Sequence, residues 1–402
     1  MQRRGARVAG FFRGLQALWS LVGITLLLIV ALELSLRVVR SVRFSGQRAL
    51  LASAAAFEGA GWARPYVDEL RAVRADWHPY VYWRGRPTDG QFIDIGTDGL
   101  RNTENLQQVN STASARASEN GGAAPIQVAV FGGSAVWGYG SRDAHTLPSE
   151  LATSLAELGV EAEVTNFGQL GYVSGQDRLA LDEELCAGRT PDVAVFFNGY
   201  NDLMSALQEG RAGIPQNETH REIEFNITTS GAFAHDLGRS ATFWLLKGLL
   251  RRSGMVVDPR ARGEVVVEGT TEAELAEAIV EAYAANVRAV EIAGASYDFA
   301  ALYYWQPAIF TKQHLVADEE RSAGSFPALG RLQAQVRERF ADTPELGDND
   351  RFHDLAGFFD EEQAAVFIDS CHFTEPGAAA LGRRLAEDVA ELVTPAEAPA
   401  NE

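Results

Sequence analysis

The stretch VAVFGGSAVWGYG, residues 128–140, carries the most information about the fold. Four apolar residues run into two glycines and a serine, and two more glycines follow among aromatic residues. A strand that ends in such a turn fits a serine nucleophile, a phosphate-binding loop or a tight turn with no chemistry. The rest of the chain has to separate these three interpretations.

Rival motifs fail in detail. A P-loop requires a lysine after its last glycine, and this chain has Ser141 and Arg142 there. The dinucleotide fingerprint GxGxxG does not occur in the stretch. The GxSxG elbow of α/β-hydrolases requires glycine at the position of Val136.

Apolar runs alternate with amphipathic segments on both sides of this stretch. Strands are predicted at residues 126–131, 161–167, 193–198, 299–305 and 365–369, and helices at 146–158, 174–185, 271–294 and 377–393. Thr146 is expected to cap the first of these helices, and Leu151, Leu155 and Leu158 share one of its faces. This alternation predicts an α/β protein with a parallel, doubly wound sheet.

Polar and glycine residues follow four of the predicted strands. They are Gly133-Ser134, the loop NFGQLG (166–171), the loop NGYND (198–202) and the segment DSCHF (369–373). In open parallel sheets, ligands bind at the carboxyl ends of the strands. These loops are therefore expected to converge at one edge of the sheet.

The residues in these loops suit nucleophilic catalysis. Ser134 supplies a hydroxyl, His372 can act as its base, and Asp369 can hold the far nitrogen of the imidazole ring. The backbone N–H groups of Ser134 and Gly171 and the side-chain amide of Asn201 can stabilise an oxyanion. This chemistry requires no metal and no organic cofactor.

The segments GGSAVWGYG, NFGQLGYVSG, FFNGYND and IDSCHFTEPG resemble the four blocks of the SGNH (GDSL-type) hydrolases, in the same order. The resemblance covers residues 126–393. It implies a flavodoxin-like three-layer α/β/α sandwich, with Ser134, His372 and Asp369 as a catalytic triad and Ser134, Gly171 and Asn201 as the oxyanion hole. The upstream segments YVYWRGRP and DGLRNT also resemble the membrane-proximal part of anchored bacterial relatives. One departure is that the family's GDS is GGS here, so Gly133 replaces an acidic residue.

The N-terminus predicts a membrane anchor. Residues 15–36 are apolar with a single charge, Glu33, and as a helix they would cross the hydrocarbon core. A cleaved signal peptide is the alternative, but its apolar region is usually only about 7–15 residues long. Arginines flank the segment on both sides, and the short N-terminal arm favours a large domain outside the cytoplasm, periplasmic or extracellular.

The chain is accordingly divided into five parts. These are an N-terminal arm (1–14), the anchor (15–36), a membrane-proximal stalk and linker (37–125), the hydrolase domain (126–393) with an insertion at about 203–270, and a tail (394–402). Within the stalk, residues 45–80 are predicted to be helical, and residues 76–87 a packed irregular segment. Residues 110–125 are predicted to form an exposed linker.

The composition limits the partners. A formal net charge of -19 argues against a nucleic-acid partner, since phosphate binding needs a basic surface. Cys186 and Cys371 are the two cysteines, and two free thiols are favoured over a disulfide.

The sequence thus predicts a single-pass membrane esterase or acylhydrolase that acts on a carboxylic ester, such as an acyl or acetyl group of an envelope glycan or lipid. An O-acyltransferase that uses the same acyl-enzyme, and a catalytically silent glycan- or lipid-binding module, stay open as alternatives.

Overall fold

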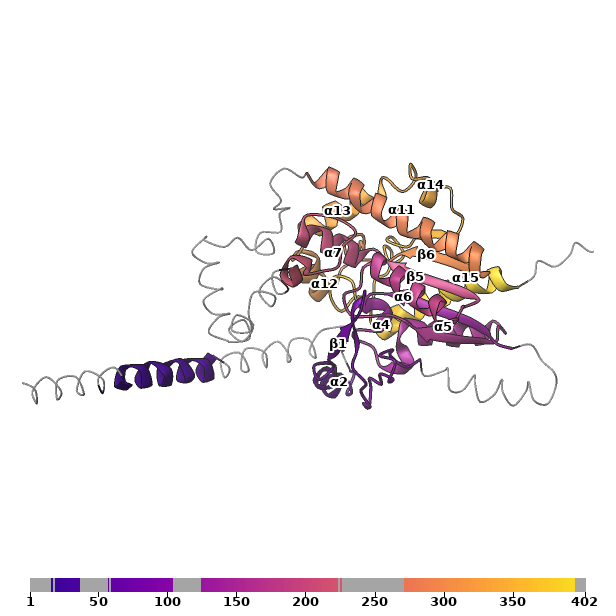
Figure 1. Ribbon diagram of the computed structural model, residues 1–402. Helices are drawn as coiled ribbons and strands as arrows, with labels where there is room; N and C mark the ends of the chain where they lie inside the picture. The colour runs from indigo at the N-terminus through magenta and orange to yellow at the C-terminus, as the bar shows by residue number, and fades with distance from the viewer. Residues whose placement is uncertain are drawn as a thin grey trace, which may run out of the picture. The chain divides into compact units, whose positions relative to one another are not determined.

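The structure is a computed structural model that describes residues 16, 19–36, 57, 59–103, 124–222, 225 and 271–394. Contacts divide the chain into two units, and the larger one comprises Leu51–Glu218 and Pro259–Glu402 (Figure 1). Most of the predicted stalk and the predicted hydrolase domain belong to this one unit. The predicted arm (1–14), most of the linker (110–125), most of the insertion (203–270) and all but the first residue of the tail lie outside the described residues.

A parallel sheet forms the centre of the larger unit. Its strand order is β4-β3-β5-β6-β7, where the strands are β3 (Ile126–Gly132), β4 (Ala162–Asn166), β5 (Val193–Asn198), β6 (Ala300–Trp305) and β7 (Phe352–Asp354). All four neighbouring pairs are parallel. Counted along the chain, the order is 2-1-3-4-5, as in flavodoxin. The prediction of an α/β fold with a parallel, doubly wound sheet is confirmed.

Helices cover both faces of the sheet. Along β5, Ala194 and Phe196 pack into one core, whereas Val193, Val195 and Phe197 pack into the other. This alternation is that of a strand buried on both sides. The first core includes residues of α6 (Ser174–Cys186), α7 (Tyr200–Glu209), α11 (Glu272–Tyr297) and α13 (Pro327–Arg337), and the second includes residues of α5 (Leu147–Glu157) and α15 (Glu375–Val393). The result is a three-layer α/β/α sandwich.

The starts of the helices follow their sequence signals. Thr146 caps α5 by accepting a hydrogen bond from the Ser149 N–H, as predicted. Leu151 and Leu155 are fully buried, but Leu158 is exposed because α5 ends at Glu157. The shorter helices are α4 (Ser134–Trp137), the 3-10 turn η2 (Asp143–His145), α12 (Ala317–Ala323) and α14 (Pro344–Gly347).

The prediction of a last strand at residues 365–369 is wrong. Within this run only Phe367 makes a β-bridge, an isolated antiparallel one to Phe373. The backbone N–H groups of Val366 and Phe367 donate to the buried carboxylate of Glu319, so they are not available to a neighbouring strand. The fifth strand is instead the short polar β7, which has no apolar run to reveal it.

The segment 59–103 differs from the predicted stalk. Residues 45–56 of the helix predicted over 45–80 lie outside the described part, and in the described residues from 59 to 80 the α-helix covers only α2 (Ala63–Leu70). It is followed by an antiparallel hairpin, β1 (Ala75–His78) and β2 (Tyr82–Gly85), where an irregular segment was predicted. Tyr66, Val67 and Ile93 are buried in a small core of their own together with Trp137 of α4. This segment is therefore packed against the fold.

The described part of the predicted anchor is one helix, Trp19–Leu36, with a mean hydropathy of 2.1. Its length and composition suffice to cross a membrane.

Candidate active site

Three side chains that are far apart in sequence form a continuous chain of hydrogen bonds. Ser134 opens α4 directly after β3, and its Oγ lies 2.6 Å from Nε2 of His372. The other ring nitrogen of His372, Nδ1, lies 2.6 Å from Oδ2 of Asp369. The structure thus brings together the three residues that the sequence singled out for a triad. An imidazole held in this way can take a proton from the serine hydroxyl.

Asp369 is held in its ionised form. Its Oδ1 accepts hydrogen bonds from the backbone N–H groups of Cys371 and His372, both at 3.0 Å. Burial acts to raise the pKa of Asp369, but the neighbouring His372 and these two N–H donors outweigh it and lower the pKa below its ordinary value. A permanent negative charge therefore faces the imidazole.

Tyr139 packs on the imidazole, a contact that the sequence did not predict. The two ring centroids are 4.4 Å apart, with the planes tilted by 34°. Tyr139 lies inside the stretch 128–140, so the aromatic-glycine pattern WGYG was the available signal. An aromatic ring in this position limits the rotation of the His372 imidazole.

The predicted oxyanion donors lie at the start of two helices and in one loop: Ser134 opens α4, Asn201 is the second residue of α7, and Gly171 lies in the loop between β4 and α6. Asn201 donates from Nδ2 to the carbonyl of Tyr172 at 2.7 Å, and its Oδ1 accepts from Gln216 at 3.1 Å. A primary amide has two N–H groups, so one remains for a ligand. Gly171 precedes Tyr172 and has a φ of +81°, which L side chains rarely adopt.

Gly133 explains how Asn201 comes close to the serine. A Cβ on Gly133 would overlap Nδ2 of Asn201 and would lie 3.3 Å from the carbonyl oxygen of Tyr172. The Asn201 amide therefore occupies the space that a side chain at position 133 would take. Glycine at position 133, where the GDS pattern has an aspartate, is therefore what allows the Asn201 amide to lie here.

Asp202 follows Asn201 in sequence, and its carboxylate accepts a hydrogen bond from the backbone N–H of Gly199, in the loop that leads to Asn201. It is buried and accepts hydrogen bonds from both the N–H and the hydroxyl of Ser174, at 3.1 and 2.6 Å, at the start of α6. Burial raises the pKa of Asp202 to about 6.

Two residues of the segment 59–103, Arg101 and Tyr66, form hydrogen bonds that fix the loop that follows α4. The guanidinium of Arg101 is fully buried and donates to the carbonyls of Trp137, Gly138, Phe92 and Ser141 and to Asp143. The hydroxyl of Tyr66 accepts from the Gly140 N–H at 2.7 Å. Tyr139, which packs on His372, lies between these anchored glycines. Arg101 and Tyr66 belong to no recognisable sequence motif, so their contacts with this loop could not be predicted from the sequence.

The hairpin holds the second loop of the site. The indole N–H of Trp83 donates to the Leu170 carbonyl at 2.9 Å, and the Tyr172 hydroxyl donates to the Trp83 carbonyl. The Gly85 N–H donates to Gln169 at 3.0 Å. The loop that contains Gly171 is thus fixed by residues more than eighty positions upstream.

A buried ion pair fixes the loop that leads to Asp369. Lys312 and Glu319 are both almost fully buried, and Lys312 also donates to the Ala364 carbonyl at 2.7 Å. Glu319 accepts the N–H groups of Val366 and Phe367. All these contacts fall within a few residues of Asp369.

Asp369, Cys371 and His372 also lie close enough together to consider a metal. Both nitrogens of His372 are engaged by Ser134 and Asp369. Burial raises the pKa of the Cys371 thiol well above its ordinary value, which disfavours the thiolate that a metal requires. The donor set therefore suits proton transfer better than metal binding. Cys186 and Cys371 are both free thiols, as favoured from the sequence.

No protein-family model and no curated protein matches the chain. Among solved structures, the chain is similar to a lipase/acylhydrolase from Enterococcus faecalis, with 14% identity, a TM-score of 0.37 and coverage of 68% of this chain and 100% of the other. It is also similar to an acetyl xylan esterase, with 16% identity, a TM-score of 0.35 and coverage of 67% and 100%. A third is a lipolytic protein of the G-D-S-L family from Desulfitobacterium hafniense, with 10% identity, a TM-score of 0.35 and coverage of 65% and 98%. Likeness at this level assigns no activity, so function has to be inferred from the residues of this chain.

Proposed function

We propose that this chain is a serine hydrolase that cleaves carboxylic esters. The observation that carries the proposal is the unbroken hydrogen-bond chain from Ser134 through His372 to Asp369. A serine in such a chain can be activated as a nucleophile, because the imidazole accepts its proton as the new bond forms.

The reaction follows from these contacts. Ser134 Oγ attacks the acyl carbon while its proton moves to His372 Nε2. The oxyanion accepts hydrogen bonds from the N–H groups of Ser134 and Gly171 and from the amide of Asn201. The proton then passes to the leaving alcohol, and the acyl group stays on Ser134. Water, deprotonated by His372, releases the acid and restores the serine.

We also propose that the enzyme acts at a membrane. The apolar helix Trp19–Leu36 would anchor the chain in a membrane, with the hydrolase domain outside the cytoplasm. The substrate would then be an acyl or acetyl ester on a glycan or lipid of the cell envelope.

The test uses the full-length chain in detergent and its Ser134→Ala variant. Both are treated with a fluorophosphonate probe and assayed on p-nitrophenyl acetate and butyrate, with the exposed Ser325→Ala as a matched control. We expect labelling and turnover in the wild type and in Ser325→Ala, and their loss in Ser134→Ala. A folded wild type that neither labels nor turns over would contradict the proposal and favour a binding module. An acylated product formed only when a sugar acceptor is added would identify a transferase.

A further inference from the structure

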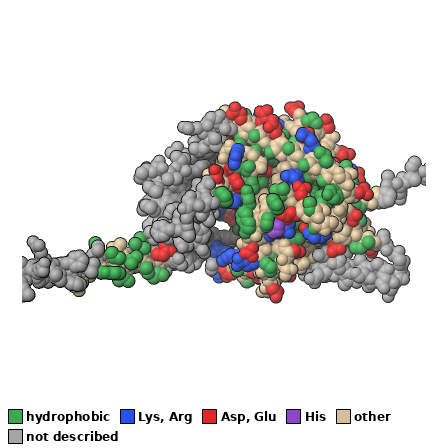
Figure 2. Space-filling view, viewed as in Figure 1, with side chains coloured by type: hydrophobic (Ala, Val, Ile, Leu, Met, Phe, Trp, Pro, Cys, Tyr) green, Lys and Arg blue, Asp and Glu red, His purple; other side chains and the backbone are tan. Residues whose placement is uncertain are grey.

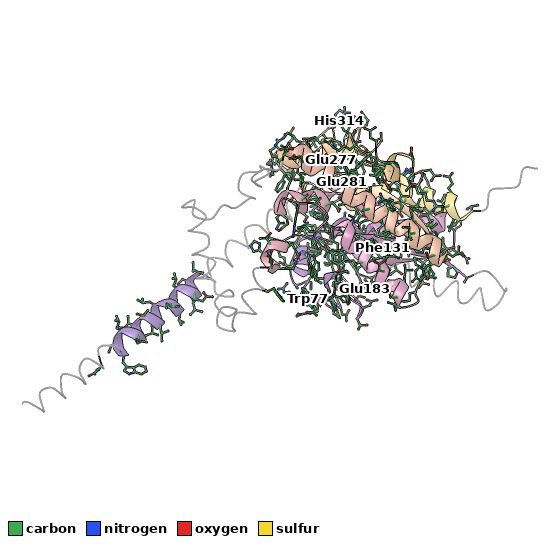
Figure 3. The ribbon with its side chains drawn as sticks, turned by 45° about the horizontal axis from the view of Figure 1, so that its top comes forward. Trp77, Phe131, Glu183, Glu277, Glu281 and His314 are labelled. Atoms are coloured by element: carbon green, nitrogen blue, oxygen red, sulfur yellow. The ribbon has the colours of Figure 1, made fainter. Side chains whose placement is uncertain are left out.

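The β1–β2 hairpin exposes aromatic side chains next to the proposed site. Trp77 and Tyr80 are 69% and 77% exposed, high values for aromatic residues. The ring of Trp77 lies 5.4 Å from that of Tyr82, and Tyr82 lies 6.5 Å from Trp83, with tilts of only 33° and 26°. We call Trp77, Tyr82 and Trp83 the aromatic ladder. Figure 3 labels Trp77 at the lower edge of the described body, and Phe131 within it.

The inner end of the ladder reaches the oxyanion loop. Trp83 Cζ2 lies 3.8 Å from the position that a Cβ on Gly171 would occupy. The indole N–H of Trp83 donates to the carbonyl of Leu170, the neighbouring residue. A ligand that lies along the ladder would therefore end beside Gly171, one of the proposed oxyanion donors.

The backbone of the hairpin is strained at two of its aromatic residues, Tyr80 and Tyr82. Tyr80 and Tyr82 have φ values of +63° and +75°, where glycine or asparagine is favoured and a bulky residue is an outlier. Between them, Val81 is fully buried and its carbonyl accepts from Gln176 at 2.7 Å. The turn is thus pinned to the core at Val81, while Tyr80 is held outward. Strain of this kind concentrates at ligand-binding sites.

Charged and polar groups surround the rings. Arg84 pairs with Glu183 at 2.8 Å, Arg86 pairs with Asp76, and the Tyr82 hydroxyl donates to Glu218 at 3.0 Å. Figure 2 shows basic side chains, coloured blue, gathered over α2 and β1. Burial of these ion pairs in lipid would be costly, whereas they could exchange hydrogen bonds with the hydroxyls of a ligand in water.

We propose that the aromatic ladder binds a saccharide chain and directs an acylated sugar to Ser134. Sugar rings combine apolar C–H faces with hydroxyl edges, and these match the ladder's ring faces and its charged surroundings respectively. The acyl-transfer part of this inference rests on the proposed function, but saccharide binding by the ladder does not.

The test measures saccharide binding by calorimetry on the full-length chain in detergent. The probes are cellohexaose, chitohexaose and a polymannuronate hexamer, each with its monosaccharide. We expect at least one hexamer to bind, and its monosaccharide to bind more weakly. The Trp77→Ala substitution should lower the affinity for that hexamer roughly 5- to 10-fold. Trp77→Phe should retain most of the affinity, and Tyr297→Ala, a matched exposed aromatic on α11, should leave it unchanged.

The same variants separate this inference from the proposed function. Turnover of p-nitrophenyl acetate, which is too small to reach Trp77, should be unchanged in Trp77→Ala, and Ser134→Ala should keep its saccharide affinity. Saccharide binding through Trp77 without any esterase activity would overturn only the proposed function. Absence of binding of all three hexamers, or binding that Trp77→Ala does not alter, would overturn the ladder as a saccharide site. Quenching of tryptophan emission by brominated lipid that is smaller in Trp77→Ala than in the wild type, with saccharide binding unchanged, would instead place these rings at a membrane; Trp19 of the apolar helix contributes equally to both.

Discussion

Asp369 has the environment that a charged orienting residue requires. Two backbone N–H groups and the imidazole of His372 bind its carboxylate and lower its pKa, so it stays ionised at neutral pH. Asp369→Asn would remove this charge and allow the wrong tautomer of His372. We expect kcat on p-nitrophenyl acetate to fall roughly 10³- to 10⁴-fold, as when the aspartate of a serine-protease triad is replaced. A loss of less than about tenfold in a folded variant would speak against a triad.

Gly133 offers a test of the proposed oxyanion donor. Gly133→Ala would place a methyl group where the Asn201 amide now lies, and the amide would have to move. We expect kcat to fall roughly 100-fold, the effect of losing one oxyanion donor, with little change in KM. Asn201→Ala should produce a similar loss. The two changes together should cost no more than either alone, and additive losses would show that Gly133 acts in another way.

At the scale of single residues, the sequence revealed site residues that come directly after a strand and missed those that reach the site from distant segments. The places of Ser134 and Asn201 could be predicted because the carboxyl ends of parallel strands meet at one edge. Asp369 and His372 were singled out by their spacing and by the resemblance of the segment IDSCHFTEPG, since the strand expected before them does not form. Tyr139 lies in the stretch 128–140 that the sequence analysis singled out, but its contact with His372 could not be predicted. Arg101 could not be predicted, since its role depends on carbonyls up to 40 positions away that only the folded chain brings to it.

Among the elements, the segment 59–103 has the most direct effect on the site. Arg101→Met would leave four carbonyls and Asp143 without their buried cation. We expect the free energy of unfolding to fall by about 3–5 kcal/mol, measured in urea by near-ultraviolet circular dichroism. Arg86→Met, which breaks an exposed ion pair, should have little effect. Equal effects of the two changes would mean that Arg101 is not a structural anchor.

The start of α6 should make stability depend on pH. Because the pKa of Asp202 is raised to about 6 from 3.8, the folded chain keeps a proton that the unfolded chain releases between these values. Stability is therefore greatest below this window and falls as pH rises through it, by about 3 kcal/mol in total. Asp202→Asn keeps an oxygen for Ser174 and should reduce this fall in urea titrations from pH 4 to 7. The remaining fall would come from Asp177, whose pKa is also raised well above its ordinary value by burial. Asp342→Asn, at an exposed position, should leave the slope unchanged.

Elements with strong periodicity were predictable, and those defined by a single long-range contact were not. The strands at 126–131, 193–198 and 299–305 are almost entirely apolar because helices cover both of their faces. The run at 365–369 looks the same in sequence. Its N–H groups are bound by the Glu319 carboxylate, 47 and 48 positions away, which no local pattern reveals.

For the whole molecule, we expect membrane attachment and esterase turnover to reside in different parts of the chain. The helix Trp19–Leu36 is apolar enough to hold the chain in a membrane, while the larger unit begins only at Leu51. We expect the full chain to stay with membranes after carbonate extraction, and a chain that lacks residues 1–50 to be released. The shortened chain should keep its turnover of p-nitrophenyl acetate within about twofold, because all the contacts of the triad lie in the larger unit. A full chain that carbonate releases would contradict anchoring by this helix.

The two thiols differ enough in environment to allow selective labelling. Burial keeps Cys371 protonated beside His372, whereas Cys186 is exposed at the last residue of α6. Because alkylating reagents attack the thiolate, a maleimide dye should modify Cys186 in the native chain and leave Cys371 intact. The 13 residues of α6 put this position about 20 Å from the end of the helix that faces the site. One native cysteine thus provides a fluorescent reporter without any substitution.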